Sequence, residues 1–248
     1  MRRAQALLTT ASLAAAVTAT LVMTPVATPA ATSTLRSALP AVVTTHKGLL
    51  VKRLKGVHDA TQVISVTTSH YGSTTATVRA YAKRAGQWHR VFGPWTSRIG
   101  RNGFAPPGKK REGDGRTPSG SYHFSFFFGV ASKPHVHYHW RHARTTSYWD
   151  DDSNSSRYNE WVDSRHASPG RDPEPLHVTP SYDDVAVIAY NTKRVPGRGS
   201  AIFLHVEHPG ATSGCVSLPR HDVLKLLRWL RPSHHARIIM GKTSVVTE

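Results

Sequence analysis

Cys215 is the single cysteine of a chain of 248 residues, and His205 precedes it by ten positions. A thiol attacks as the thiolate, and its ordinary pKa of roughly 8.5 leaves little of that form at neutral pH. An imidazole close to the sulfur can take its proton, so the two residues predict nucleophilic catalysis through a covalent sulfur intermediate. The alternative is an inert cysteine that packs as a small apolar side chain.

The residues next to Cys215 suit acyl transfer. Gly214 lets the backbone come close to a substrate, and the amides of Gly214 and Cys215 could donate to a developing oxyanion. His205 lies near the end of an apolar run at residues 201–206, which predicts a strand. The Pro-Gly sequence at 209–210 can fold the chain back so that the imidazole reaches the thiol.

An amphipathic helix is predicted directly after Cys215, at residues 219–231. Its apolar residues recur at helical spacing, and Pro232 ends the pattern. Ser217 is the expected N-cap, so the positive end of the helix would lie near the thiol and favour the thiolate. The apolar residues are Val223, Leu226, Leu227 and Leu230.

Strands are predicted over most of the remaining chain. Alternating or β-branched runs occur between short turn sequences such as Arg84-Ala85-Gly86, and a tight turn is expected at residues 117–120. The region 131–180 is expected to be a long polar and aromatic loop, which by its length is functional or carries short elements of its own. The predicted strands are residues 63–68, 75–83, 87–92, 95–99, 122–130, 185–190, 201–206 and 236–240.

The N-terminal residues have the pattern of a secretory signal peptide. Arg2 and Arg3 precede an uncharged run at residues 11–23, which is shorter than the ~20 apolar residues of a membrane-spanning helix. We expect a signal peptide at 1–31 and a linker or N-terminal arm at 32–56, with a retained membrane anchor as the alternative. Export argues against nucleic acid as a partner. The lone cysteine has no second cysteine with which to form an intramolecular disulfide, the usual state of cysteines in exported proteins.

Basic residues strongly outnumber acidic ones. Lys and Arg total 32 against 15 Asp and Glu, a formal net charge of +17. Such a surface attracts polyanions, and for an exported protein these would be anionic cell-wall polymers. Simple solubility is the alternative explanation of the charge.

The segment from His205 to Ser213-Gly214-Cys215-Val216 resembles the signature of the L,D-transpeptidase catalytic domain, the YkuD family. The sequences at 113–120, at Ala189-Tyr190-Asn191 and at 199–206 are also similar to the family. The resemblance covers residues 57–241, followed by a C-terminal tail at 242–248. It implies a mainly β fold, a β-sandwich-like domain of mixed sheets.

The sequence departs from the commoner family signature in two ways. No second histidine stands between Ser213 and Gly214, and the loop from His205 to Cys215 is shorter. The shorter form resembles an actinobacterial-like, short-loop branch of the family. In the family a backbone carbonyl just after the histidine orients its ring, and by position this would be the carbonyl of Val206.

The resemblance implies a cysteine acyltransferase that acts on peptidoglycan stem peptides without a cofactor or metal. Cys215 would attack the carbonyl of the third residue, expel the terminal D-alanine and form a thioester, with His205 moving the protons. An amine from another stem would then give a cross-link, and water would make the enzyme a carboxypeptidase. The protein would be secreted or wall-associated, without a stable membrane span after signal cleavage.

Two other functions stay open. His135, His137 and His139 would share one face of a strand and could bind zinc in a hydrolase, although no cysteine or suitably spaced acid accompanies them. A non-catalytic wall-binding protein of the same fold is the second. The acidic run at residues 150–152 is interpreted as a solvated turn rather than a calcium loop. His208 is expected to be a surface residue. A catalytic role is the lesser alternative, because the residue lies within the catalytic loop.

Overall fold

The structure, a computed structural model, describes residues 48–248. The predicted signal peptide at 1–31 and the first part of the predicted arm lie outside the described residues. Within residues 48–248 no helix is both long enough and apolar enough to cross a membrane.

Most of the regular structure consists of strands. β2 and β3 form a long hairpin whose turn residues, Ala85 and Gly86, both have positive φ angles, as the predicted short loop requires. The strands are β1 (Gln62–Thr68), β2 (Thr75–Arg84), β3 (Gln87–Arg98), β4 (Phe104–Ala105), β5 (Thr117–Pro118), β6 (Gly120–Gly129), β7 (Trp140–His142), β8 (Ser147–Asp150), β9 (Glu160–Asp163), β10 (Glu174–Pro175), β11 (Val185–Ile188), β12 (Phe203–Val206), β13 (Val216–Leu218) and β14 (Arg237–Lys242).

Nine strands form one mixed sheet in the order β11-β12-β13-β3-β2-β1-β14-β6-β7. β11 also pairs with β6, which closes the sheet into a barrel of eight strands and leaves β7 beside β6. The β1–β14, β12–β13 and β6–β7 pairs are parallel. The prediction of a mainly β fold with mixed sheets is confirmed, and the largest sheet closes on itself.

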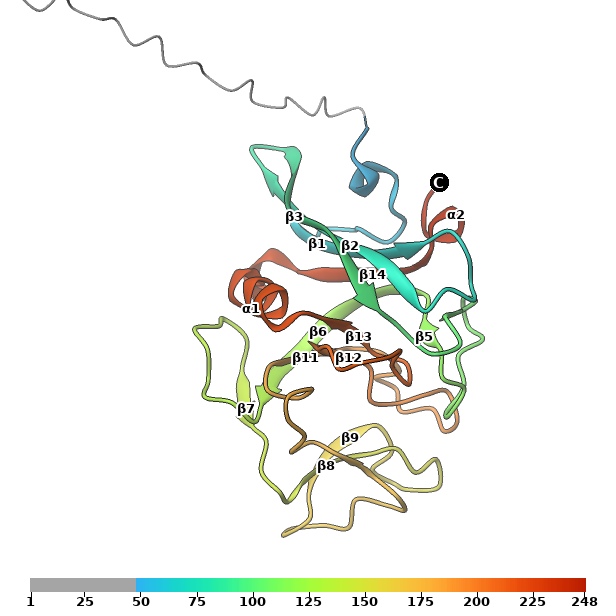
Figure 1. Cartoon of the computed structure of the whole chain (residues 1–248), viewed down its shortest axis with the longest axis vertical. Helices are drawn as coiled ribbons and strands as arrows, with labels where there is room; N and C mark the ends of the chain where they lie inside the picture. Colours follow the sequence, from blue (N-terminus) through green and yellow to red (C-terminus); the bar gives the residue numbers. More distant parts are fainter. Residues whose placement is uncertain (1–47) are drawn as a thin grey trace, which may run out of the picture. The chain divides into compact units, whose positions relative to one another are not determined.

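The helices are few and short. The predicted amphipathic helix is present as α1 (Arg220–Trp229), and its apolar residues, together with Leu230, are fully buried in the main core. In Figure 1, α1 lies against the side of the barrel strands. The other helical segments are η2 (Leu50–Arg53), η3 (Pro232–His234) and α2 (Thr243–Val246).

The helix begins within one residue of the predicted start, but the predicted N-cap is wrong. Ser217 lies inside strand β13, and Pro219 occupies the N-cap position without a side-chain cap. Four residues, from Val216 to Pro219, therefore separate Cys215 from α1, roughly 13 Å of extended chain. Because the helix dipole acts mainly within the first turn, it does not explain an activated thiol here.

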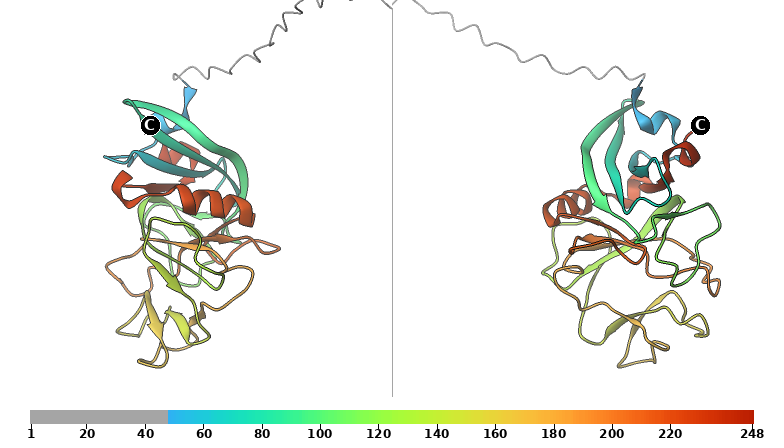
Figure 2. Two further views of the ribbon diagram at one scale, coloured as in Figure 1. Left: turned by 90° about the vertical axis from the view of Figure 1, so that its left-hand side faces the viewer. Right: turned by 45° about the vertical axis from the view of Figure 1, so that its right-hand side comes forward.

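The two ends of the described chain pack together. Lys55 donates its amide to the carbonyl of Val246, and Leu54 forms a β-bridge with Thr247. Both views of Figure 2 show the blue segment that follows residue 47 beside the red C-terminal segment. Val51, Leu54 and Val246 share a small core with residues of β1 and β14, so both ends contribute buried apolar surface.

Two local predictions need correction. The strands predicted at 87–92 and 95–99 are one strand, β3, which passes through Gly93-Pro94 with register shifts against β2. The turn predicted at 117–120 contains β5, which pairs with β4. The region 131–180 does carry short elements of its own, namely β7 and the three-stranded sheet β10-β8-β9, drawn at the lower end of Figure 1.

Candidate active site

Two parallel strands bring Cys215 and His205 into one cavity. His205 pairs with Ser217 in the β12–β13 register, and Cys215 stands two residues before Ser217. Because side chains alternate along a strand, the thiol and the imidazole project to the same side. Both line a cavity of about 440 Å³. We call this space the thiol cavity.

The thiol of Cys215 rests in its neutral form. Its side chain is 8% exposed, its Sγ accepts the Phe203 amide at 3.3 Å, and the thiol donates to the Ala201 carbonyl at 3.2 Å. Burial raises the pKa of Cys215 to about 12, and the Phe203 amide only partly opposes this. Nucleophilic attack by this sulfur would therefore need a base nearby.

His205 is oriented to act as that base. Its Nδ1 lies 2.8 Å from the Val206 carbonyl. A carbonyl can only accept a hydrogen bond, so Nδ1 carries the proton and Nε2 keeps its lone pair. Burial lowers the pKa of His205 to about 4, which keeps the ring neutral at physiological pH. The ring of Tyr182 packs edge-on against the imidazole at 5.4 Å.

Two threonines fix the backbone at Cys215. Thr212 Oγ1 and Thr117 Oγ1 donate to the Cys215 carbonyl at 2.7 and 3.3 Å, and Thr117 Oγ1 accepts the Gly100 amide at 2.9 Å. Sequence analysis missed this role of Thr117, although the residue lies in the segment 113–120 that resembles the family. Because that segment was interpreted as a turn, the buried hydrogen bond from Thr117 to the Cys215 backbone was not predicted.

Gly214 and Ser213 have different surroundings. Gly214 has a φ of +152°, and a Cβ there would lie 3.0 Å from the Arg116 carbonyl, so glycine suits the position. Its amide donates to Thr212 Oγ1 at 3.2 Å rather than into the cavity, unlike the expected oxyanion donor. Ser213 is exposed, lines the thiol cavity and accepts a hydrogen bond from Arg101 at 3.0 Å.

Three carboxylates that the sequence analysis did not select also line the thiol cavity: Glu112, Asp151 and Glu174. Glu112 accepts a hydrogen bond from Tyr158, and Glu174 accepts one from Tyr182 at 2.9 Å. Burial and the neighbouring carboxylates raise the pKa of Asp151 to about 7. The sequence spacing does not predict this group, because its members come from separate parts of the chain: the turn at Glu112, the end of β8 before Asp151, and β10 at Glu174.

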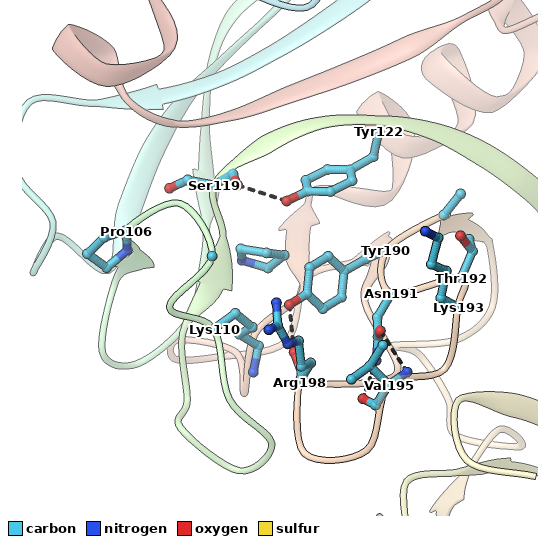
Figure 3. Close-up of a pocket in the computed structure, with 13 residues that line it drawn as sticks. Pro106, Lys110, Ser119, Tyr122, Tyr190, Asn191, Thr192, Lys193, Val195 and Arg198 are labelled. Carbon is cyan, nitrogen blue, oxygen red and sulfur yellow. Dashed lines mark hydrogen bonds between the residues drawn. The ribbon is translucent and has the colours of Figure 1, made fainter. Parts of the chain in front are cut away.

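A second cavity of about 430 Å³ adjoins the first (Figure 3). Tyr122 and Tyr190 pack edge to face at 5.5 Å there, and the Tyr190 hydroxyl donates to the Arg198 carbonyl at 2.6 Å. Lys110 lines both cavities. Tyr190 and Asn191, part of the motif quoted for the family resemblance, line this second cavity and not the thiol cavity. We call it the tyrosine cavity.

The histidine cluster does not form the predicted strand. Residues 135–139 are irregular and β7 begins at Trp140, so the three imidazoles do not share one strand face. His137 instead lies 3.3 Å from the Arg231 guanidinium. Among residues 48–248, no group of three His, Cys, Asp or Glu side chains is arranged to hold a metal ion.

The other candidates fall close to the thiol cavity. His208 is exposed and lines it. Asp150, the first residue of the acidic run, is fully buried and accepts hydrogen bonds from the Ser155 hydroxyl and the Asp152 amide. The interpretation of residues 150–152 as a solvated turn is therefore wrong for Asp150, which holds its own loop together.

Comparisons with known proteins agree with the motifs. The model of the L,D-transpeptidase catalytic domain, YkuD, matches residues 73–246. Among solved structures, the helical cell shape determining protein Pgp2 from Campylobacter jejuni aligns with a TM-score of 0.39 and 12% identity over 77% of this chain. The chain spans about half of that protein, 51% of its length. No curated protein matches significantly. Since the family model covers most of the chain, including Cys215 and His205, the protein belongs to the L,D-transpeptidase catalytic domain family.

Proposed function

We propose that the protein is an exported cysteine acyltransferase that cross-links or remodels peptidoglycan stem peptides through a thioester on Cys215. One observation carries the proposal: Cys215 and His205 line one cavity, and the Val206 carbonyl holds the proton of His205 on Nδ1, which makes Nε2 the nitrogen to take the thiol proton. The family match supplies the substrate class.

The first half-reaction forms the thioester. The Cys215 thiol gives its proton to Nε2 of His205 as Sγ bonds to the carbonyl carbon of the third stem residue. The carbonyl oxygen becomes an oxyanion, for which the Cys215 amide is the expected donor. When the intermediate collapses, the C–N bond to D-alanine breaks and His205 gives the proton to the departing amine.

The second half-reaction releases the enzyme. An amine of another stem loses its proton to His205, attacks the thioester carbon and displaces the sulfur, which regains the proton. Attack by water follows the same proton path and gives a shortened peptide. The acceptor therefore decides between cross-linking and trimming.

A neutral thiol beside a neutral imidazole suits this sequence. With the pKa of Cys215 at about 12 and that of His205 at about 4, proton transfer in the empty site is unfavourable. Attack on a carbonyl reduces this penalty when hydrogen-bond donors stabilise the oxyanion, because the negative charge moves from sulfur to that oxygen. The thiol is then protected from oxidants until a substrate occupies the cavity.

The cellular setting follows from the family and the charge. Enzymes of this family act on the cell wall, so we place the protein outside the cytoplasm, with residues 1–31 as its signal peptide. The net charge of +17 would hold it against anionic wall polymers, and added salt should weaken that attachment.

Release of D-alanine from a stem tetrapeptide tests the proposal. Purified protein should release D-alanine, Cys215→Ser should abolish the release, and a chelator should have no effect. Adding an amine acceptor decides the outcome of the second step, since a cross-linked product identifies a transpeptidase and a free tripeptide a carboxypeptidase. No release by the folded wild-type protein would favour a non-catalytic wall-binding protein.

A further inference from the structure

Three carboxyl groups of the thiol cavity, those of Glu112, Asp151 and Glu174, form no ion pair within residues 48–248. The chain has 32 basic residues against 15 acidic ones, so the lack of a cationic partner is not due to a shortage of basic residues. Burial raises the pKa values of Asp151 and Glu174, and the neighbouring carboxylates add to the rise at Asp151. A cation in the cavity would stabilise the ionised form of these groups, so the cluster suits a cationic ligand.

The basic residues of the same cavity do not fill this role. Lys110 directs its ammonium to Asp114 at 2.7 Å and to the Arg111 carbonyl at 2.6 Å. Arg101 is exposed and donates to Ser213.

Two of the three carboxylates are held in place by groups next to the reacting atoms. Glu174 accepts from Tyr182, whose ring packs against His205. Glu112 accepts a hydrogen bond from the Ser200 hydroxyl at 2.8 Å. Ala201, the residue after Ser200, supplies the carbonyl that accepts the hydrogen bond of the Cys215 thiol. A cation bound here would belong to the molecule that Cys215 attacks.

Ser217 gives a second, independent sign of a ligand. Its side chain is 1% exposed, and its Oγ has no hydrogen-bond partner within the described chain. The residue lines the thiol cavity and lies opposite His205 in the strand register. A buried hydroxyl without a partner is costly, so a polar group of the substrate would satisfy it.

We propose that Glu112, Asp151 and Glu174 form a subsite for the protonated primary amine on the side chain of the substrate's third residue, while Ser217 contacts the polar backbone beside the scissile bond. The inference rests on the proposed function, since it takes the carbonyl of that residue to Cys215. An alkylammonium donates three hydrogen bonds and is attracted by all three carboxylates.

Two alternatives fit less well. A metal ion needs convergent ligands, and no group of three suitable side chains in residues 48–248 is close enough to hold one. The tyrosine cavity would repel an ammonium, because Lys110, Lys193 and Arg198 line it and none of its lining residues is acidic.

Calorimetric binding to the Cys215→Ala protein tests the subsite without turnover. The probes are two stem tetrapeptides that differ only at the third residue, which is lysine in one and ε-acetyl-lysine in the other. We expect the free amine to bind at least tenfold more tightly, as charge-assisted hydrogen bonds imply. Asp151→Asn and Glu174→Gln, added singly, should each reduce this preference at least threefold.

Asp163→Asn is the matched control, because Asp163 lies on β9, pairs with Arg165 and does not line the thiol cavity. Equal binding of the two peptides would overturn the subsite, as would an Asp163→Asn effect as large as that of Asp151→Asn. Thioester formation by wild type without amine preference overturns only the subsite. Amine preference without a thioester overturns only the proposed acyl transfer.

Discussion

The thiol cavity and the tyrosine cavity are nearly equal in size and share Lys110, yet they differ in chemistry. The first contains a buried thiol, a buried imidazole and three carboxylates. The second is lined by tyrosines and exposed cations (Figure 3). Size alone therefore does not locate the reaction. Burial does not separate them either, because it also raises the pKa values of Tyr122 and Tyr190 in the tyrosine cavity. The difference is that the thiol cavity holds a thiol and an imidazole, the pair on which the proposed chemistry depends.

The largest expected difference between the cavities is the loss of the nucleophile. Cys215→Ser should lower D-alanine release by about 10³-fold or more, because a serine hydroxyl is far less acidic than the thiol. Tyr190→Phe in the tyrosine cavity should change it by less than about threefold, since it removes one exposed hydrogen bond. Steady-state kinetics on both variants makes the comparison, and equal losses would remove the distinction between the cavities.

Loss of the base should come next. His205→Ala should lower the rate by about 10²–10⁴-fold, the usual contribution of a positioned general base. The base works only when neutral, so wild-type activity should persist as pH falls through 6.5 and decline towards pH 4, where His205 becomes protonated. The pH profile of the initial rate, with folding monitored in parallel, checks this. A half-maximal point near pH 6.5 would show that the imidazole is not buried as described.

The threonine anchor should matter less for the rate and more for stability. Thr117→Val removes the buried acceptor of the Gly100 amide and one of two donors to the Cys215 carbonyl. We expect a loss of about 1–3 kcal/mol in the free energy of unfolding, measured by urea denaturation. Tyr190→Phe, which removes an exposed bond, is the control. Equal stability of Thr117→Val and wild type would mean that the anchor is not formed in solution.

Asp151→Asn should have the smallest effect, and its sign depends on pH. The folded protein holds the pKa of Asp151 at about 7, above its ordinary 3.8, so the unfolded chain releases this proton more readily. Wild type therefore loses stability as pH rises from about 4 to 7, and the variant avoids this loss. Asp151 is half-buried, so we expect a gain below about 1 kcal/mol at pH 8 and none at pH 4. Thermal unfolding at both pH values measures it, and a variant less stable at pH 8 would contradict the raised pKa.

The sequence predicted the parts of the site that are close along the chain. Cys215, Gly214 and His205 belong to one strand-loop-strand segment, so residue type and spacing sufficed. The amphipathic helix was equally visible, because its four apolar positions repeat regularly. Strand β13 was missed because three residues are too few to show an alternating pattern, and the expected N-cap at Ser217 failed for that reason.

The carboxylates could not be predicted because they converge only in the folded chain. Glu112, Asp151 and Glu174 come from separate segments of the chain, and each alone resembles a solvated surface acid. The protonation state of Cys215 could not be predicted from the sequence either. Sequence suggested a thiolate stabilised by a helix, whereas burial favours the neutral thiol. The convergence of the carboxylates and the burial of the thiol both depend on the packing of the whole domain.

Intact-protein mass spectrometry after mixing with a stem tetrapeptide tests the central claim most directly. The account predicts a mass increase equal to the tetrapeptide minus D-alanine, located on Cys215 by peptide mapping and absent from Cys215→Ser. It further predicts that His205→Ala slows the appearance of this adduct. A wild-type protein that stays unmodified while folded, or an adduct on another residue, would contradict the claim that Cys215 is the acylated nucleophile.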